Sequence, residues 1–310
     1  KLLCVDRTSS LKRLYRFPID ILEEYTTGCA DCVVVNSKFT GGQFKSAFKT
    51  LGADYIPKVL YPSIDMPVNT NNNTSISTSY TPYLKNADHI FVSLNRYERK
   101  KNIPLALQAF KLLLDKMKEI SSSKSFPSPE KIKLVIAGGY DTRVTENVEH
   151  HKELVKYSED SGISLYVVFR QSIDDNERNE LLQRASALLY TPSNEHFGIV
   201  PLEAMSLGTP VIAVNNGGPL ETIKHEVTGF LCNENPNDFM EAMYKIVEDC
   251  QTKKMGINGI NHVKENFTND VMKSQLQNYL NETIQQKNQI RVIKYLLQII
   301  FIPLSFFVVL

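Results

Sequence analysis

The sequence predicts an α/β protein in which a parallel sheet carries helices on both faces. Short runs of β-branched and apolar residues, such as HIFVSLN (89–95) and KLVIAGG (133–139), are typical of buried strands. Between them lie segments such as IPLALQAFKLLLDKM (103–117), whose apolar residues recur at helical spacing. Alternating strands and helices favour a parallel sheet, because parallel strands are usually connected by a helix. At 310 residues, the chain is long enough for two domains.

The same patterns place the other elements along the chain. The expected strands are 32–37, 57–65, 89–95, 133–139, 164–169, 186–193, 210–214 and 229–232. The expected helices are 9–27, a short helix ending at Phe48, 103–117, 144–158, 174–184, 198–207 and further helices up to about residue 286. The polar stretch NTNNNTSISTSYT (69–81) cannot bury enough apolar surface to order itself, which predicts a loop or linker.

Charge and cysteine content narrow the class of protein. The formal net charge is +1, so the overall charge gives no reason to expect a nucleic-acid partner. The five scattered cysteines indicate free thiols in a reducing compartment. Cys29 and Cys32 form a single C-x-x-C, which has no second pair to complete a zinc site. Buried thiols are favoured over metal or redox chemistry, which stays open as the alternative.

The two ends of the chain carry further signals. The first residue is Lys rather than Met, so we expect an amino-terminal part to be missing. The end of the chain, YLLQIIFIPLSFFVVL (295–310), is almost entirely apolar and follows Arg291 and Lys294, which favours a membrane-associated tail over 290–310 rather than a buried core helix. The basic amphipathic helix expected over 9–27 is compatible with solvent or with acidic lipid headgroups.

The segment NRYERKKN (95–102) places several cations at the end of an expected strand. Ligands bind at the carboxyl ends of strands in parallel sheets. Arg96 and Lys101 therefore suit a diphosphate, since arginine offers a planar fork of donors and lysine a compact charge. A solvated basic loop is the alternative. The turn AGG (137–139) lacks the complete dinucleotide-binding fingerprint, so it gives only weak support for a dinucleotide site.

The segment SNEHFGIVPLEA (193–204) carries two carboxylates, Glu195 and Glu203, with seven residues between them. The strand before it should deliver Glu195 to the cleft, and Glu203 should lie about one turn inside the following helix. A carboxylate can accept two hydrogen bonds from a vicinal diol, so one acid could hold a sugar and the other a ribose. The alternative is that Glu195 caps a helix and Glu203 lies at the surface.

The start of that helix should favour an anion. Pro201 fits a first helical turn, and the amides of Phe197, Gly198 and Ile199 should point towards the ligand. Gly198 would let the ligand approach closely. For His196, contact with a sugar and structural packing remain open. A last expectation, for a different helix, is that the adjacent His150 and His151 lie at the surface.

Three motifs together resemble a known enzyme family. Arg96-x4-Lys101, the Glu195-x7-Glu203 pair and GGPLET (217–222) resemble the retaining glycosyltransferases of the GT-B fold, family four. Longer runs, among them LKRLYRFPID, NRYERKKN and TPSNEHFGIVPLEAM, are similar to the family's mannosyltransferases that build dolichol-linked oligosaccharides. The resemblance covers most of residues 9–265.

This resemblance implies two Rossmann-like domains with parallel sheets, of which the first is only partly present. It divides the chain into a remnant of the acceptor domain (1–68), a polar linker (69–83), a nucleotide-sugar-binding domain (84–267), a helix (268–289) and the hydrophobic tail (290–310).

The resemblance also implies an activity. The enzyme would transfer mannose from GDP-mannose to a mannosyl-chitobiose-diphosphodolichol acceptor, with alpha-1,3 and alpha-1,6 linkages, on the cytosolic face of the endoplasmic reticulum membrane. Arg96 and Lys101 would neutralise the departing GDP diphosphate, Glu195 would orient the mannose and Glu203 the ribose. The donor-binding group would be His196, Phe197, Gly198, Ile199 and Glu203.

Three further points concern cofactors, partners and alternatives. The chain has no Asp-x-Asp, so we expect no metal requirement. Other enzymes of lipid-linked oligosaccharide assembly are possible partners. The alternatives are a family-four enzyme with a different nucleotide sugar and a non-catalytic membrane scaffold of the same fold; the presence of Lys101, Glu195 and Glu203 argues against the scaffold.

Overall fold

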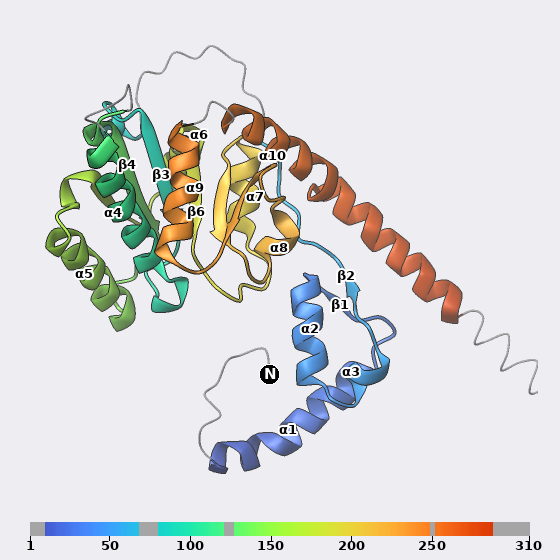
Figure 1. Ribbon diagram of the computed structural model, residues 1–310. Helices are drawn as coiled ribbons and strands as arrows, with labels where there is room; N and C mark the ends of the chain where they lie inside the picture. Colours follow the sequence, from blue (N-terminus) through green and yellow to red (C-terminus); the bar gives the residue numbers. More distant parts are fainter. Residues whose placement is uncertain (1–9, 68–79, 121–126, 249–251, 288–310) are drawn as a thin grey trace, which may run out of the picture. The chain divides into compact units, whose positions relative to one another are not determined.

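The computed structural model of the protein describes residues 10–67, 80–120, 127–248 and 252–287 (Figure 1). The chain divides into two compact units, one formed by Lys1–Pro62 and Asn269–Leu310 and the other by Ser63–Thr268. The predicted hydrophobic tail lies outside the described residues, as does most of the predicted linker. Among the residues that are described, no helix combines the length and apolar character needed to cross a bilayer.

The unit Ser63–Thr268 is built on a six-stranded, fully parallel sheet. Its strands are β3 (His89–Leu94), β4 (Ile132–Gly138), β5 (Val167–Gln171), β6 (Ala187–Tyr190), β7 (Val211–Val214) and β8 (Gly229–Cys232). Their spatial order is β5-β4-β3-β6-β7-β8. The order reverses between the neighbours β3 and β6, and in doubly wound sheets ligands bind outside the carboxyl ends of the strands at this point.

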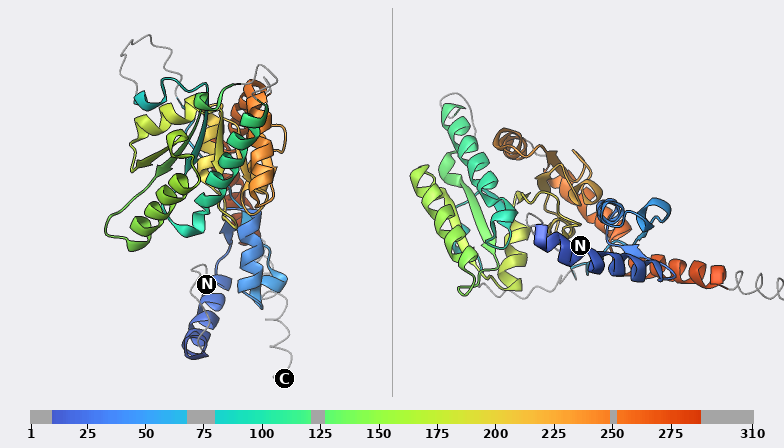
Figure 2. Two further views of the ribbon diagram at one scale, coloured as in Figure 1. Left: turned by 60° about the vertical axis from the view of Figure 1, so that its left-hand side comes forward. Right: turned by 90° about the horizontal axis from the view of Figure 1, so that it is seen from below.

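Helices cover both faces of this sheet (Figures 1 and 2). Alternate strand residues such as Phe91, Leu134 and Leu189 share one core with α4 (Ile103–Ile120), α5 (Thr145–Asp160) and α9 (Pro236–Glu248). Because successive side chains of a strand point to opposite faces, the residues between them face the other side. That side is covered by α6 (Asp175–Arg184) and α7 (Ile199–Ser206), and α10 (Thr252–Asn266) packs on α7. The alternation predicted from the sequence is therefore confirmed.

Four predicted strands differ from the observed ones by more than one residue. Of the runs expected at 32–37 and 57–65, only Val34–Val35 and Lys58–Val59 form strands. The strand expected at 164–169 begins as a 3-10 turn, Ser164–Tyr166, and β5 occupies Val167–Gln171 instead. Leu165 in that turn is exposed, so an apolar run here did not indicate a buried strand. The strand expected at 186–193 ends at Tyr190, because the chain leaves the sheet there to form the loop that carries Glu195.

The described residues of the other unit, Lys1–Pro62 and Asn269–Leu310, form fewer helices and strands. It contains α1 (Ser10–Gly28), β1 (Val34–Val35), α2 (Lys38–Ala47), α3 (Leu51–Asp54), β2 (Lys58–Val59) and a helix over 269–287. Strands β1 and β2 are parallel partners. Tyr279 Oη donates to Val59 O at 2.8 Å, which ties the helix over 269–287 to β2.

The expectation that His150 and His151 lie at the surface is wrong. His150 is buried, and its Nδ1 lies 3.2 Å from Glu153 Oε2. His151 is half-buried, and its ring contacts those of Tyr97, Tyr140 and Phe169 edge-on. Both residues lie on the side of α5 that packs on the domain, because the buried stripe of this helix includes position 150.

A candidate active site at the carboxyl ends of β3 and β6

The loop after β3 brings Lys101 to Glu195, which follows β6. Lys101 Nζ lies 2.6 Å from Glu195 Oε2. The side chains are 15% and 28% exposed, so the pair is partly shielded from water yet reachable from the surface. Since β3 and β6 are the two strands at which the sheet order reverses, the ion pair stands at the expected ligand site of the fold. The sequence placed both residues at strand ends, and the structure joins them.

The β3 loop is held by its neighbours on both sides. Tyr97 is fully buried, and its Oη donates to Ile136 O and Arg170 O, each at 3.0 Å. On the β6 side, Thr191 Oγ1 donates to Lys101 O at 2.7 Å. These contacts fix the backbone that carries Lys101 with groups from β4, β5 and the end of β6.

Arg96 occupies a different place from Lys101. Its side chain is 62% exposed, and its Nη1 lies 3.0 Å from Glu98 Oε1. Gly139 lies beside the Arg96 side chain: a Cβ added at Gly139 would be 3.2 Å from Arg96 Cγ. The two cations predicted to share one diphosphate thus have separate carboxylate partners in this structure, Glu98 for Arg96 and Glu195 for Lys101.

The loop that carries Glu195 packs on the turn of the GGPLET segment. Gly218 N donates to Glu195 O at 2.7 Å. An added Cβ at Gly217, whose φ is +65°, would lie 2.6 Å from Glu195 O, and one at Gly218 would lie 2.2 Å from Phe197 O. Both glycines are therefore required by the close approach of the two loops. The paired glycines are the sequence signal of this contact.

Tyr190, the last residue of β6, lies beneath the site. Burial is the main cause that raises the pKa of its hydroxyl, and the negative charge of the nearby Glu195 carboxylate raises the pKa further. The phenol therefore stays protonated. Tyr190 was not among the predicted site residues, because a tyrosine inside an apolar strand is indistinguishable from a core residue.

Gly198 forms the N-cap of α7 with a φ of +80°. An added Cβ there would lie 2.8 Å from Tyr190 Oη, so the neighbour that excludes a side chain is Tyr190. Phe197 is buried with its ring centroid 5.9 Å from that of Phe267, whereas Ile199 is exposed and His196 is half-buried. The start of α7 thus lies directly after the Glu195 loop, as the sequence predicts.

Glu203 has a partner of its own, Arg178 of α6, whose Nη2 forms an ion pair with Glu203 Oε1. Both residues line a groove of about 620 Å³ to which Ile199 also contributes. Ile199 and Glu203 therefore share a side of α7, as their spacing predicts. The structure brings Glu195 to Lys101 and Glu203 to Arg178. Arg178 was missed, because nothing in the sequence distinguishes it from a solvated residue of α6.

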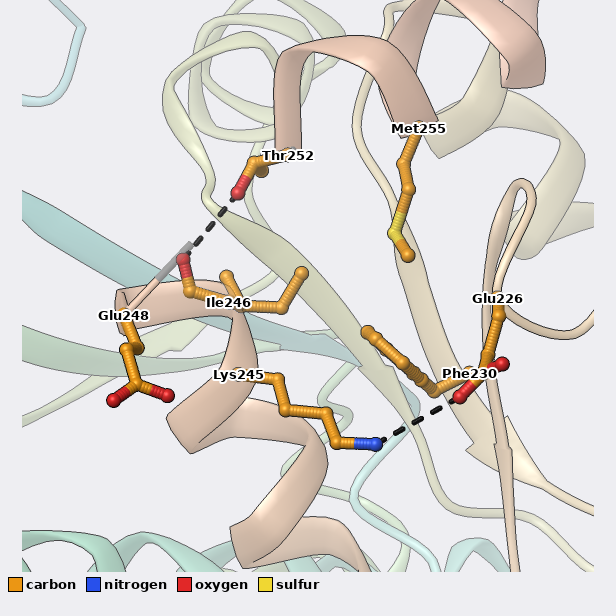
Figure 3. A pocket seen from close by; sticks show the side chains of 7 residues that line it. All are labelled: Glu226, Phe230, Lys245, Ile246, Glu248, Thr252 and Met255. Atoms are coloured by element: carbon orange, nitrogen blue, oxygen red, sulfur yellow. Dashed lines mark hydrogen bonds and ion pairs between the residues drawn. The ribbon is translucent and has the colours of Figure 1, made fainter. Parts of the chain in front are cut away.

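A second hollow of about 430 Å³ lies among β8, α9 and α10 (Figure 3). Figure 3 shows Lys245 reaching towards Glu226, with Phe230 and Met255 beside them, and the Lys245 Nζ to Glu226 Oε1 distance is 3.7 Å. None of the predicted site residues lines this hollow.

Within the described ranges, no group of three or more His, Cys, Asp or Glu side chains could hold a metal ion. Metal independence stays a prediction.

Comparison with known proteins identifies relatives for most of the chain. The family model "Glycosyl transferases group 1" matches residues 82–262. The chain is 46% identical over 285 residues to the alpha-1,3/1,6-mannosyltransferase ALG2 of Homo sapiens, covering 91% of this chain and 66% of that relative. It is also 46% identical to the protein of the same name in Dictyostelium discoideum, covering 86% of this chain and 64% of the relative. The chain therefore spans about two thirds of the length of these relatives.

Solved structures show the same fold at lower identity. A glycosyltransferase from Rickettsia africae aligns with a TM-score of 0.67 and 16% identity, covering 90% of this chain and 69% of that one. Anabaena HepE in complex with UDP-glucose aligns with a TM-score of 0.65 and 22% identity, covering 82% and 64% respectively. The predicted α/β fold with a parallel sheet is confirmed, and its structural neighbours are GT-B glycosyltransferases. The two Rossmann-like domains and their boundaries stay a prediction.

Proposed function

Because this chain belongs to the group 1 glycosyl transferases, we propose that it transfers mannose from GDP-mannose to a mannosyl-chitobiose-diphosphodolichol acceptor. The products carry alpha-1,3 and alpha-1,6 linkages. The proposal is supported by relatives that are 46% identical and bear the name alpha-1,3/1,6-mannosyltransferase. The geometry of the site supports the same reaction class.

The observation that carries the proposal is the ion pair of Lys101 and Glu195 at the point where the sheet order reverses. When the bond between the sugar and the diphosphate breaks, negative charge builds on the leaving GDP. A fixed cation at that point stabilises the transition state more than the ground state. Lys101 supplies this charge, and the exposed Arg96 turns from Glu98 to add a second cation.

The carboxylates hold the two ends of the donor. Glu195 accepts hydrogen bonds from mannose hydroxyls, and its contact with Lys101 gives it a defined orientation. Glu203, which lies eight residues after Glu195 in the chain, holds the ribose. The backbone amides of Phe197, Gly198 and Ile199, together with His196, complete the donor contacts at the start of α7. In this scheme the cations of the protein neutralise the diphosphate, and no metal ion is required.

The place of action follows from the acceptor. A lipid-linked acceptor requires the site to work beside a membrane, and we place the enzyme on the cytosolic face of the endoplasmic reticulum. Other enzymes of lipid-linked oligosaccharide assembly would then be its neighbours, because they supply its acceptor and use its product.

The test is to incubate the full-length protein with GDP-mannose and the lipid acceptor and to determine the linkages of the product. We expect two mannoses to be added, one in each linkage, and transfer by the Lys101→Met variant to fall by roughly tenfold to over a hundredfold. UDP-glucose in place of GDP-mannose tests the alternative nucleotide sugar. Transfer from UDP-glucose but not from GDP-mannose would overturn the donor assignment, and transfer from neither would favour the non-catalytic scaffold.

A further inference from the structure

Glu234 lies two residues beyond β8, and its carboxylate reaches the loops that follow two other strands. Asn102 Nδ2, in the loop after β3, donates to Glu234 Oε1 at 2.9 Å. Ser193 Oγ, in the loop after β6, donates to Glu234 Oε2. A single exposed side chain therefore joins the loops after β3, β6 and β8.

The two loops that Glu234 joins are those that carry the central ion pair. Asn102 directly follows Lys101, and Ser193 lies two residues before Glu195. Asn102 has a left-handed φ of 47°, a conformation that asparagine tolerates better than most residues. The separation of Lys101 Nζ and Glu195 Oε2 depends on the spacing of these loops. Any group that fixes the spacing also fixes the pair.

The segment that carries Glu234 is itself held in place. Asn233 Nδ2 donates to Asp238 Oδ2 at 2.7 Å, and Asp238 N donates to Asn235 Oδ1 at 2.9 Å. The hydrogen bond from Asn233 is the main cause that holds the pKa of Asp238 below its usual value, so this carboxylate stays charged at neutral pH. Glu234 thus projects from a segment that is fixed before any ligand arrives.

We propose that Glu234 is a positioning residue, which sets the separation of Lys101 and Glu195 through Asn102 and Ser193. The inference rests on the proposed function, since it concerns the donor site. Glu234 touches the loops rather than the donor, so its loss removes no ligand contact. Because the net contribution of a hydrogen bond is modest, we expect donor binding to weaken about two- to tenfold.

The test is calorimetric titration of the full-length protein with GDP-mannose, together with the thermal midpoint of each variant. We expect Glu234→Ala to weaken binding at an unchanged midpoint. Glu234→Gln keeps one acceptor for Asn102 and one amide for Ser193, so it should bind almost as the wild type does. The matched control is Glu241→Ala, which removes an exposed glutamate of α9 paired with Lys116 at 2.7 Å and should bind normally.

A double mutant tests the route of the effect. If Glu234 acts through Asn102, then adding Asn102→Ala to Glu234→Ala should cost less than the sum of the single effects. Additive losses would overturn the inference, as would wild-type affinity of Glu234→Ala or a loss that tracks a lower thermal midpoint. A Gln variant as weak as the Ala variant would assign the effect to charge and overturn it too. Absence of GDP-mannose binding by the wild type would instead refute the proposed function on which the inference rests.

Discussion

Glu195 and Glu203 are eight residues apart in the chain, yet their surroundings differ. Glu195 lies in a loop, where Lys101, Tyr190 and the glycines of the GGPLET segment surround it. Glu203 lies on the regular helix α7 and faces a groove with Arg178. Each carboxylate therefore has its own cation. Under the proposed function, these would be two subsites: one in the loop for the reacting sugar and phosphates, and one on the helix for the rest of the donor.

The largest expected effect concerns the cation of the first subsite. Lys101→Met should lower transfer roughly tenfold to over a hundredfold, because a hydrogen bond to a charged group contributes about 1.5–3 kcal/mol. The measurement is kcat/KM with GDP-mannose. Lys100→Met is the matched control, since the neighbouring lysine is largely exposed and pairs with Glu98. Equal losses in the two variants would mean that general positive charge, rather than the Lys101 position, matters.

Gly198 separates the two subsites, and its replacement should disturb the first of them. Gly198→Ala adds a Cβ 2.8 Å from Tyr190 Oη at a φ of +80°. Gly162→Ala is the control, because its φ is +69° but nothing lies within 4 Å of the added Cβ. Both variants place a non-glycine residue at a positive φ, so this conformational cost is common to both. The difference between their unfolding free energies therefore measures the steric clash of the added Cβ with Tyr190, which we expect to be about 1–3 kcal/mol. Equal midpoints in denaturant unfolding would contradict the close packing on Tyr190.

The second subsite is tested at its carboxylate. Glu203→Gln should weaken GDP-mannose binding about tenfold while the protein stays folded, because it replaces a charged acceptor of the ribose. Asp175→Asn serves as the control, since Asp175 lies 3.6 Å from Arg178 but is 92% exposed. Binding is measured by calorimetry. Unchanged affinity of Glu203→Gln would remove Glu203 from the donor site and leave one subsite.

The smallest effect is expected at Glu177, which precedes Arg178 in α6 and pairs with Arg170 at 2.7 Å, away from the donor groups. The Arg170 hydrogen bond is the main cause that lowers the pKa of Glu177. A carboxyl with a depressed folded-state pKa adds stability above its unfolded pKa and loses it as pH falls through the folded value. Glu177→Gln should therefore cost about 1 kcal/mol or less at pH 7, and this difference should shrink below about pH 4 in thermal unfolding. A gap that persists in acid would contradict the ionic origin.

The regular elements of the fold could be predicted from the sequence, whereas most side-chain contacts could not. Strands such as His89–Leu94 were predictable because their apolar runs are buried on both faces of a parallel sheet. Lys101 and Glu195 were predictable as residues at strand ends. Their direct contact was not, because it depends on the strand order, in which β3 and β6 become neighbours although residues 95–186 separate them in sequence.

The remaining site residues illustrate why side-chain partners escape the sequence. Arg178, Tyr190 and Glu234 stand in an amphipathic helix, an apolar strand and a polar turn, where their residue types are ordinary. Their roles arise only from tertiary contacts with Glu203, Glu195 and Asn102. His150 was misjudged for a related reason, since which stripe of a polar helix faces the domain is decided by packing rather than by composition.

A structure of the protein with GDP bound would show directly whether the donor occupies this site. We expect the diphosphate within about 3 Å of Lys101 Nζ, Arg96 turned towards it, and the ribose at Glu203. Guanosine diphosphate bound at a distance from Arg96, Lys101, Glu195 and Glu203 would rule out a donor site at these residues.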